Sequence, residues 1–128
     1  MSGIAMSVLV LVGAWRLVSL DEPGADGQMH RTDCSGLLVF TRDGHMSVQV
    51  MYRKAEAGSP YAQGGYEASF GKYEVDELAH TFTLHVEGAL VRSLVGKVLV
   101  RAYDLSSGRL VVKSADPNEH WRVTWERQ

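Results

Sequence analysis

Apolar and polar residues alternate over short runs along most of the chain, and this two-residue period is typical of half-buried β-strands. Clusters of Gly, Pro, Asp, Asn and Ser separate the runs. The pattern predicts about eight strands, over residues 13–20, 37–41, 45–52, 66–75, 79–86, 96–105, 109–114 and 120–127. No long helical pattern interrupts them. The sequence therefore predicts an all-β protein.

The residues between the predicted strands indicate how the strands are connected. Asp43-Gly44 is typical of a tight hairpin turn because Gly tolerates a positive φ angle, and Ser106-Ser107-Gly108 provides a second turn. Residues 21–36 are predicted to be a lid or mouth-lining loop, and residues 53–65 a second loop with a short helix at 60–62. Sequential hairpins favour an antiparallel up-and-down barrel, because closure leaves no exposed edge. Such a barrel has room for packed side chains or one small ligand.

Alternate residues of a strand share a face, so the pairing of the strands decides which side chains enter the barrel. With a turn at residues 76–78, Tyr73 is expected to lie near Thr83 and Gly71 near His85. The face predicted to line the interior carries Tyr73, Thr81, Thr83, His85 and Arg101. If the opposite face is the inner one, these groups point to solvent instead.

Three of these side chains could carry chemistry. His85, with an ordinary pKa of about 6.5, could act as an acid or a base, or it is a structural histidine bonded to a neighbouring strand. Arg101 could bind a ligand carboxylate, enolate or phenolate, or it forms an ion pair with Glu74, Glu87 or Glu126, or it points outward to solvent. Tyr73 could orient a carbonyl or donate a proton, or it is a barrel aromatic whose hydroxyl reaches water.

Further side chains are predicted to line the pocket. The proposed ligand-binding set is Thr81, Thr83, Tyr103, Trp125, Phe40 and Tyr52. Phe82 and Leu84 fall on the face opposite to His85. Exposed there, they would mark a subunit interface, so a homodimer is a further hypothesis.

Composition limits the class of protein. The chain has 128 residues, a net charge of −2 and 45% hydrophobic residues, which predicts a single domain over residues 1–128. Cys34 is the only cysteine, so an intrachain disulfide is impossible, and no pattern indicates a zinc site, another metal or a cofactor. No basic run predicts nucleic-acid binding.

Residues 1–12 form an N-terminal lead-in, of which residues 4–12 are apolar. This segment is too short to span a bilayer and lacks the basic region that opens a secretory signal. It is predicted to pack on the domain, and the protein is predicted to be cytoplasmic with no membrane partner.

The order of several motifs resembles the lipocalin-like domain family, within the calycin group of barrels. The matching segments are GAWRLVS (13–19), GLLVFTRDGHMS (36–47), FGKYEVD (70–76), HVEG (85–88), VG (95–96), Arg101 and WER (125–127). The resemblance implies a small barrel whose cavity accepts an apolar or aromatic compound. It also implies that Arg127 or Arg122 packs over Trp15. The family often has two adjacent histidines where this chain has Leu84-His85.

Two functions follow from these observations. The first is binding of a small hydrophobic or aromatic metabolite in the barrel cavity. The alternative is a cofactor-independent isomerase, cyclase or lyase of secondary metabolism, in which His85 moves a proton, Arg101 stabilises an oxyanion and Tyr73 orients the substrate. A third reading is an interaction domain with a vestigial cavity.

Overall fold

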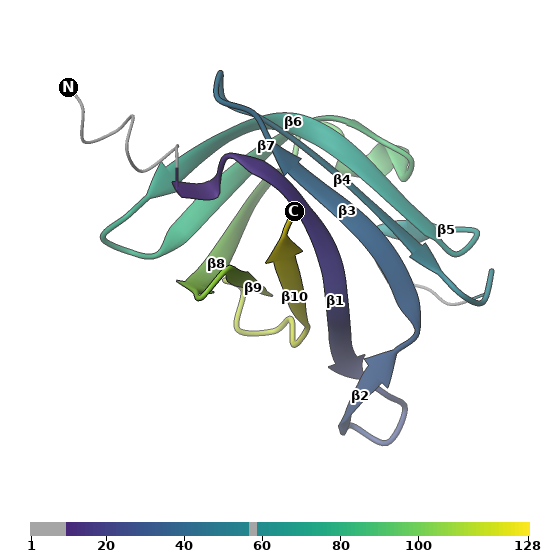
Figure 1. Cartoon of the computed structure of the whole chain (residues 1–128). Coiled ribbons are helices and arrows are strands. Elements are labelled where there is room, and N and C mark those ends of the chain that lie inside the picture. Colours follow the sequence, from purple (N-terminus) through teal and green to yellow (C-terminus); the bar gives the residue numbers. More distant parts are fainter. Residues whose placement is uncertain (1–9, 57–58) are drawn as a thin grey trace.

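The computed structural model describes residues 10–56 and 59–128, which form one closed antiparallel sheet (Figure 1). The strands are β1 (Gly13–Pro23), β2 (Met29–Thr32), β3 (Cys34–Phe40), β4 (His45–Tyr52), β5 (Ala62–Gln63), β6 (Tyr66–Asp76), β7 (Thr81–Ala89), β8 (Val98–Ser106), β9 (Arg109–Ser114) and β10 (Arg122–Arg127). A 3-10 helix, η1 (Arg92–Leu94), lies between β7 and β8.

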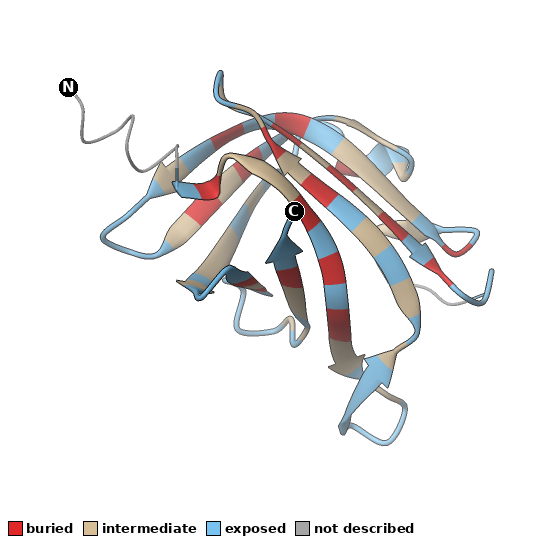
Figure 2. Cartoon of the chain, viewed as in Figure 1, coloured by how far each residue is buried: buried red, intermediate tan, exposed pale blue. Residues whose placement is uncertain are grey.

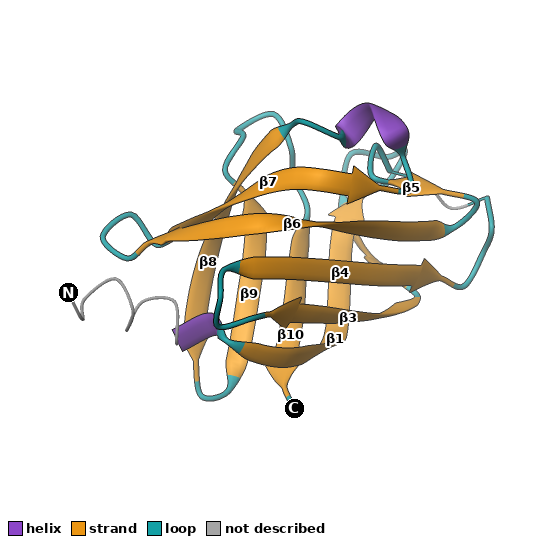
Figure 3. Ribbon diagram, turned by 90° about the horizontal axis from the view of Figure 1, so that it is seen from above, coloured by secondary structure: helices purple, strands orange, loops and turns teal. Residues whose placement is uncertain are grey.

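Eight of these strands make the barrel. They pair in the order β1-β3-β4-β6-β7-β8-β9-β10, and β10 pairs with β1 to close the sheet. β2 and β5 are short additions that pair with β1 and β6. Figure 3 shows β3, β4 and β6 crossing above β8, β9 and β10 at a steep angle. The predicted antiparallel barrel of about eight strands is confirmed.

Two predicted loops contain strands instead. β1 runs on to Pro23 and pairs with β2, so the expectation of a continuous loop over residues 21–36 is wrong. The Asp21 carboxylate accepts a 2.8 Å hydrogen bond from Arg31 across this pair. The turn between β1 and β2 contains Gly24, Asp26 and Gly27, and in it the N–H of Gly24 donates to the carbonyl of Gln28 at 2.8 Å. The short helix predicted at residues 60–62 is also wrong, because Ala62 begins β5.

Buried and exposed positions alternate along the strands, as Figure 2 shows for β1. The apolar interior includes Leu17, Leu38, Val48, Val50, Leu110 and Trp125. This alternation is what a sheet with one face toward the core and one toward solvent requires.

One end of the barrel is sealed by Trp15. Its indole N–H donates to the carbonyl of Leu11 at 2.9 Å, and both side chains are fully buried. The guanidinium of Arg127 lies 4.2 Å from the centre of the Trp15 ring and donates to the carbonyls of Val10 and Val12. The resemblance left Arg122 and Arg127 open for this position, and Arg127 occupies it. Residues 1–9 of the predicted lead-in lie outside the described residues.

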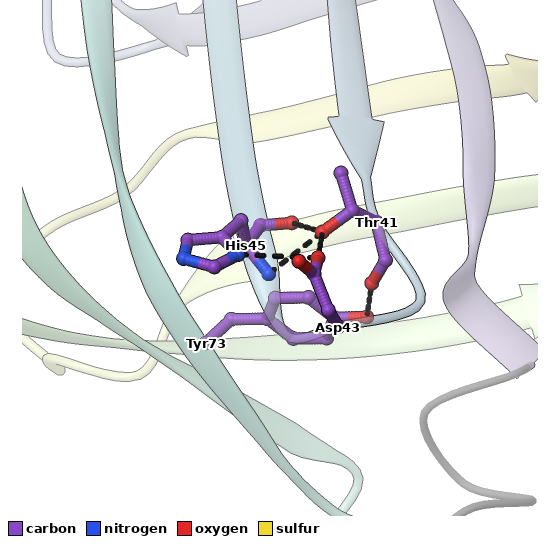
Figure 4. A network of polar contacts seen from close by, with 4 residues as sticks. All are labelled: Thr41, Asp43, His45 and Tyr73. Atoms are coloured by element: carbon purple, nitrogen blue, oxygen red, sulfur yellow. Dashed lines mark hydrogen bonds and ion pairs between the residues drawn. The ribbon is translucent and has the colours of Figure 1, made fainter.

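The turn between β3 and β4 lies at the same end (Figure 4). Tyr73 donates its hydroxyl to the carbonyl of Thr41 at 2.9 Å, and the N–H of His45 donates to Oγ1 of Thr41 at 2.9 Å. The Tyr73 ring packs edge-on against Phe40 at 4.9 Å. Burial, with the nearby Asp43 carboxylate, raises the pKa of Tyr73 to about 12. Tyr73 is therefore a neutral, fully engaged side chain of the sealed end.

The pairing of β6 with β7 differs from the prediction by one residue. Asp76 pairs with Thr81, so four residues lie between the two strands, and Tyr73 pairs with Leu84 rather than Thr83. Asp76 Oδ1 accepts from the N–H of Ala79 at 3.1 Å, and His80 takes a positive φ of 54°. A shift of one residue exchanges the two faces of a strand.

The inner face of β7 is therefore the one predicted to be outside. Phe82 and Leu84 are 1% and 3% exposed and belong to the core. The expectation that they form an exposed subunit interface is wrong, and so is the expectation that Thr81, Thr83 and His85 point inward. In contrast, β8 and β9 pair as predicted, with Arg101 opposite Ser114 and Tyr103 opposite Val112.

Candidate functional site

A cavity of about 320 Å³ occupies the barrel between the sealed end and the opposite mouth. Its walls come from inward positions of most barrel strands, and the apolar lining includes Leu17, Val48, Val50, Leu84, Val112 and Trp125. The volume lies within the range of small-molecule sites in proteins. The interior of this barrel is thus hollow rather than filled by its own side chains.

Polar side chains gather at the mouth end of the cavity. β1 contributes Glu22, β6 contributes Glu67, and β8 contributes Arg101. Tyr61 and Glu119 come from the segments that precede β5 and β10. The cavity therefore combines an apolar body with one charged end.

The guanidinium of Arg101 is held by neighbours on several sides. It lies 5.2 Å from the centre of the Tyr61 ring and 4.8 Å from that of Trp121, within range of cation–π attraction. One guanidinium nitrogen is 3.9 Å from a carboxylate oxygen of Glu119, and the Arg101 side chain is only 12% exposed. This arrangement compensates a charge that would be costly in an apolar barrel.

Glu119 is the centre of this cluster. Its carboxylate accepts hydrogen bonds from the hydroxyls of Tyr61 and, at 2.6 Å, of Ser114. Partial burial acts to raise the pKa of Glu119, but these hydrogen bonds and the Arg101 charge outweigh it, so the pKa is lowered. Glu119 is accordingly ionised at neutral pH and is already bound to groups of the protein.

The other two carboxyl groups, those of Glu67 and Glu22, have raised pKa values. Burial raises the pKa of Glu67 to about 7; the charge of Arg101 opposes the shift and that of Glu22 adds to it. Burial also raises the pKa of Glu22, against a hydrogen bond from Thr32. Oε2 of Glu22 is buried and has no hydrogen-bond partner among the described residues, and the same holds for Nε1 of Trp121. Unsatisfied polar atoms at a cavity wall are positions where a ligand can bind.

The structure brings only part of the predicted site together. Arg101, Tyr52 and Trp125 line the cavity. Phe40 and Tyr73 are buried in the sealed end, where their rings contact each other. All five side chains point to the inside of the barrel, as predicted, but Phe40 and Tyr73 are not part of the cavity lining.

Tyr103 also lies apart from the cavity. It points inward on β8, where its ring stacks on His80 at 5.7 Å and contacts Phe82 at 6.3 Å. His85 lies on the outer surface, 46% exposed, with Nε2 at 3.4 Å from Oε1 of Glu74. Thr81 and Thr83 share that outer face.

Sequence reasoning missed several residues of the cavity: Glu22, Tyr61, Glu67 and Glu119. Glu67 and Tyr73 are separated by an even number of positions on one predicted strand, so they share a face. Strand alternation alone could therefore have placed Glu67 inside the barrel. Glu22 lies in the segment expected to be a loop. Tyr61 and Glu119 lie in irregular segments, whose side-chain directions no simple period predicts.

The described residues also bear on metal binding and on membrane insertion. Among residues 10–56 and 59–128, no group of three or more His, Cys, Asp or Glu side chains is arranged to hold a metal ion. Over those residues, no helix has the length and apolar character needed to cross a membrane. Cys34 is half-buried, and burial beside Glu22, Asp33 and Glu67 raises the pKa of its thiol to about 11.

Comparison with known proteins defines the class of this barrel. A family model described as "Lipocalin-like domain" matches residues 12–128, and the chain belongs to this family. No curated protein matches the chain.

Two solved structures share the fold. A lipocalin-like protein from Bacteroides uniformis is similar with a TM-score of 0.54 and 18% identity, over 92% of this chain and 98% of that one. An uncharacterized protein from Bacteroides eggerthii is similar with a TM-score of 0.55 and 13% identity, over 92% and 99% of the two chains. At these identities the likeness concerns the fold.

Proposed function

We propose that this protein binds a small hydrophobic or aromatic metabolite in the barrel cavity. The observation that carries the proposal is the 320 Å³ cavity, with apolar walls and polar groups confined to one end. Ligand sites typically have this design, in which apolar surface provides affinity and a few polar groups fix orientation. Each 100 Å² of apolar ligand surface removed from water contributes about 2.5 kcal/mol before the cost of association.

The catalytic alternative has less support. It required His85, Arg101 and Tyr73 to face one substrate. His85 lies on the outer surface, and the Tyr73 hydroxyl is bound to the carbonyl of Thr41 in the sealed end. Of the three groups, only Arg101 lines the cavity. Binding is therefore the function that the geometry supports best.

A fluorescent probe tests the proposal. N-phenyl-1-naphthylamine is uncharged at neutral pH, is apolar, and gains fluorescence on leaving water. We expect a saturable increase with micromolar affinity at one site per chain. Val50→Phe, which places a ring in the cavity, should weaken binding by about tenfold or more.

The matched control is Val100→Phe, which makes the same change on the outer face of β8. It should leave the affinity unchanged. If the two variants bind the dye equally, the dye sits on the surface and the proposal is wrong. A wild-type protein that does not bind the dye would also contradict it.

A further inference from the structure

The charged end of the cavity contains more acidic than basic groups. Three carboxyl groups line it, those of Glu22, Glu67 and Glu119, against the single guanidinium of Arg101; His120 lies there too. The sequence predicted that Arg101 binds an anionic group of a ligand. Which of these four groups is available to a ligand depends on the partners that each already has in the protein.

Arg101 and Glu119 are largely engaged with the protein. The guanidinium faces the rings of Tyr61 and Trp121 and the carboxylate of Glu119. Glu119 in turn accepts from Tyr61 and Ser114. An anionic ligand group would have to compete with Glu119 for Arg101, and it would approach two further carboxyl groups. Like charges at short range in a partly dry site are unfavourable.

Glu22 and Glu67 are the groups left without comparable partners. Oε2 of Glu22 is buried and accepts no hydrogen bond. The Glu67 side chain is subject to the opposing charges of Arg101 and Glu22. Both side chains line the same cavity, and the charge of Glu22 acts on Glu67. A buried acceptor without a donor is costly until a ligand supplies one.

We propose that the ligand of this cavity carries a protonated amine, held by Glu22 and Glu67, on an apolar or aromatic body. The proposal rests on the function proposed above and names the chemical class of the ligand. An ammonium group offers three donors, enough to reach both carboxyl groups at once. A hydroxyl group offers one donor, and a carboxylate offers none. Charge-assisted hydrogen bonds to carboxylates are also the stronger kind.

Three probes with the same ten-carbon chain test the head group: decylamine, decanol and decanoate. Each is titrated against the protein at pH 7.5, by displacement of N-phenyl-1-naphthylamine and by calorimetry. We expect decylamine to bind about tenfold more tightly than decanol, and decanoate to bind most weakly. A decanoate affinity equal to or above that of decylamine would overturn the proposal, and so would decanol binding as tightly as decylamine.

Variants locate the effect. Glu22→Gln and Glu67→Gln keep the size of each side chain and remove its charge, so decylamine affinity should fall by about tenfold while decanol affinity stays within about twofold. Glu74→Gln on the outer face of β6 is the matched control and should change neither affinity. Unchanged decylamine binding in both cavity variants would place the amine elsewhere and refute the assignment.

The outcomes separate the two proposals. If none of the three probes displaces the dye or releases heat, the cavity does not bind apolar molecules, and the proposed function fails together with this inference. If the probes bind but without preference for the amine, the proposed function stands and only the head-group assignment is wrong. The wild-type series gives this answer even if a variant does not fold.

Discussion

The guanidinium of Arg127 lies 4.2 Å from the ring centre of Trp15, so a side chain of the last strand covers the first. The same guanidinium donates to the carbonyls of Val10 and Val12 at 2.8 and 2.9 Å. Arg127 therefore holds together β10, the start of β1 and the residues that precede it. This contact is one part of the packing that closes the sealed end of the barrel.

Replacing Arg127 with Ala should lower the free energy of unfolding by about 2 kcal/mol. The change removes one cation–π contact and two charge-assisted hydrogen bonds, which are partly exposed to solvent. Urea denaturation followed by tryptophan fluorescence measures the loss. Arg109→Ala, which removes an exposed ion pair with Glu126 at 3.6 Å, should cost less than about 0.5 kcal/mol. Equal losses in the two variants would show that the stacking on Trp15 contributes nothing.

Glu67 should make the stability of the protein depend on pH. Because the pKa of Glu67 is raised from 4.5 to about 7, the folded state binds more protons than the unfolded state between these values. The free energy of unfolding should therefore be highest below pH 4.5 for this group and fall as the pH rises to 7, by about 3 kcal/mol in total.

Glu67→Gln removes that group, so the variant should be more stable than the wild-type protein at pH 8 and similar to it at pH 5. Thermal melts across this range measure the difference. Glu74→Gln, whose side chain is exposed, serves as the control and should follow the wild-type curve. A Glu67→Gln curve with the wild-type slope would mean that the carboxyl group titrates normally.

Tyr73→Phe should affect stability but leave ligand binding unchanged. The variant loses the 2.9 Å hydrogen bond to the carbonyl of Thr41, which is worth about 1 kcal/mol. Dye affinity should stay at the wild-type value, because Tyr73 lies in the sealed end rather than in the cavity. His85→Ala should alter neither property, since its 3.4 Å contact with Glu74 is exposed. Loss of dye binding in either variant would reopen the role that the sequence assigned to these residues.

Gly71→Ala should destabilise the barrel strongly, by about 3 kcal/mol or more. A Cβ atom at this position would lie 1.9 Å from the carbonyl oxygen of His85, where neither backbone can yield without breaking the β6–β7 pairing. Circular dichroism melts would detect the change. Ser69→Ala, two residues earlier on the same inner face, should cost much less. The β6–β7 pairing has a register shift between Phe70 and Gly71. A Gly71→Ala protein with wild-type stability would mean that the pairing can adjust freely at this shift.

The sequence predicted the strand pairing correctly where a glycine marks the turn between two strands. The β3–β4 and β8–β9 hairpins contain Gly44 and Gly108, and both glycines have the positive φ angles that tight turns need. The β6–β7 turn has no glycine; His80 takes the positive φ there instead. Without that signal, the predicted turn was wrong by one residue, and His85 was assigned to the wrong face.

The site was harder to predict than the fold for a related reason. Arg101 was found because the register of β8 was correct. Glu22 was missed because its neighbours have the composition of a loop, although they form the end of β1. The partners of Arg101, Tyr61 and Glu119, come from irregular segments that only the folded chain brings together.

The pairing of β1 with β10 affects how the chain folds during its synthesis. Its first and last strands are neighbours, so the cylinder can be completed only after residues 122–127 have left the ribosome. Until then β1 and β9 each present an unpaired edge, which is the kind of surface that recruits other chains. Pairing between such distant parts of a chain also slows folding. Nascent chains that stall before β10 should therefore be the species most prone to aggregation.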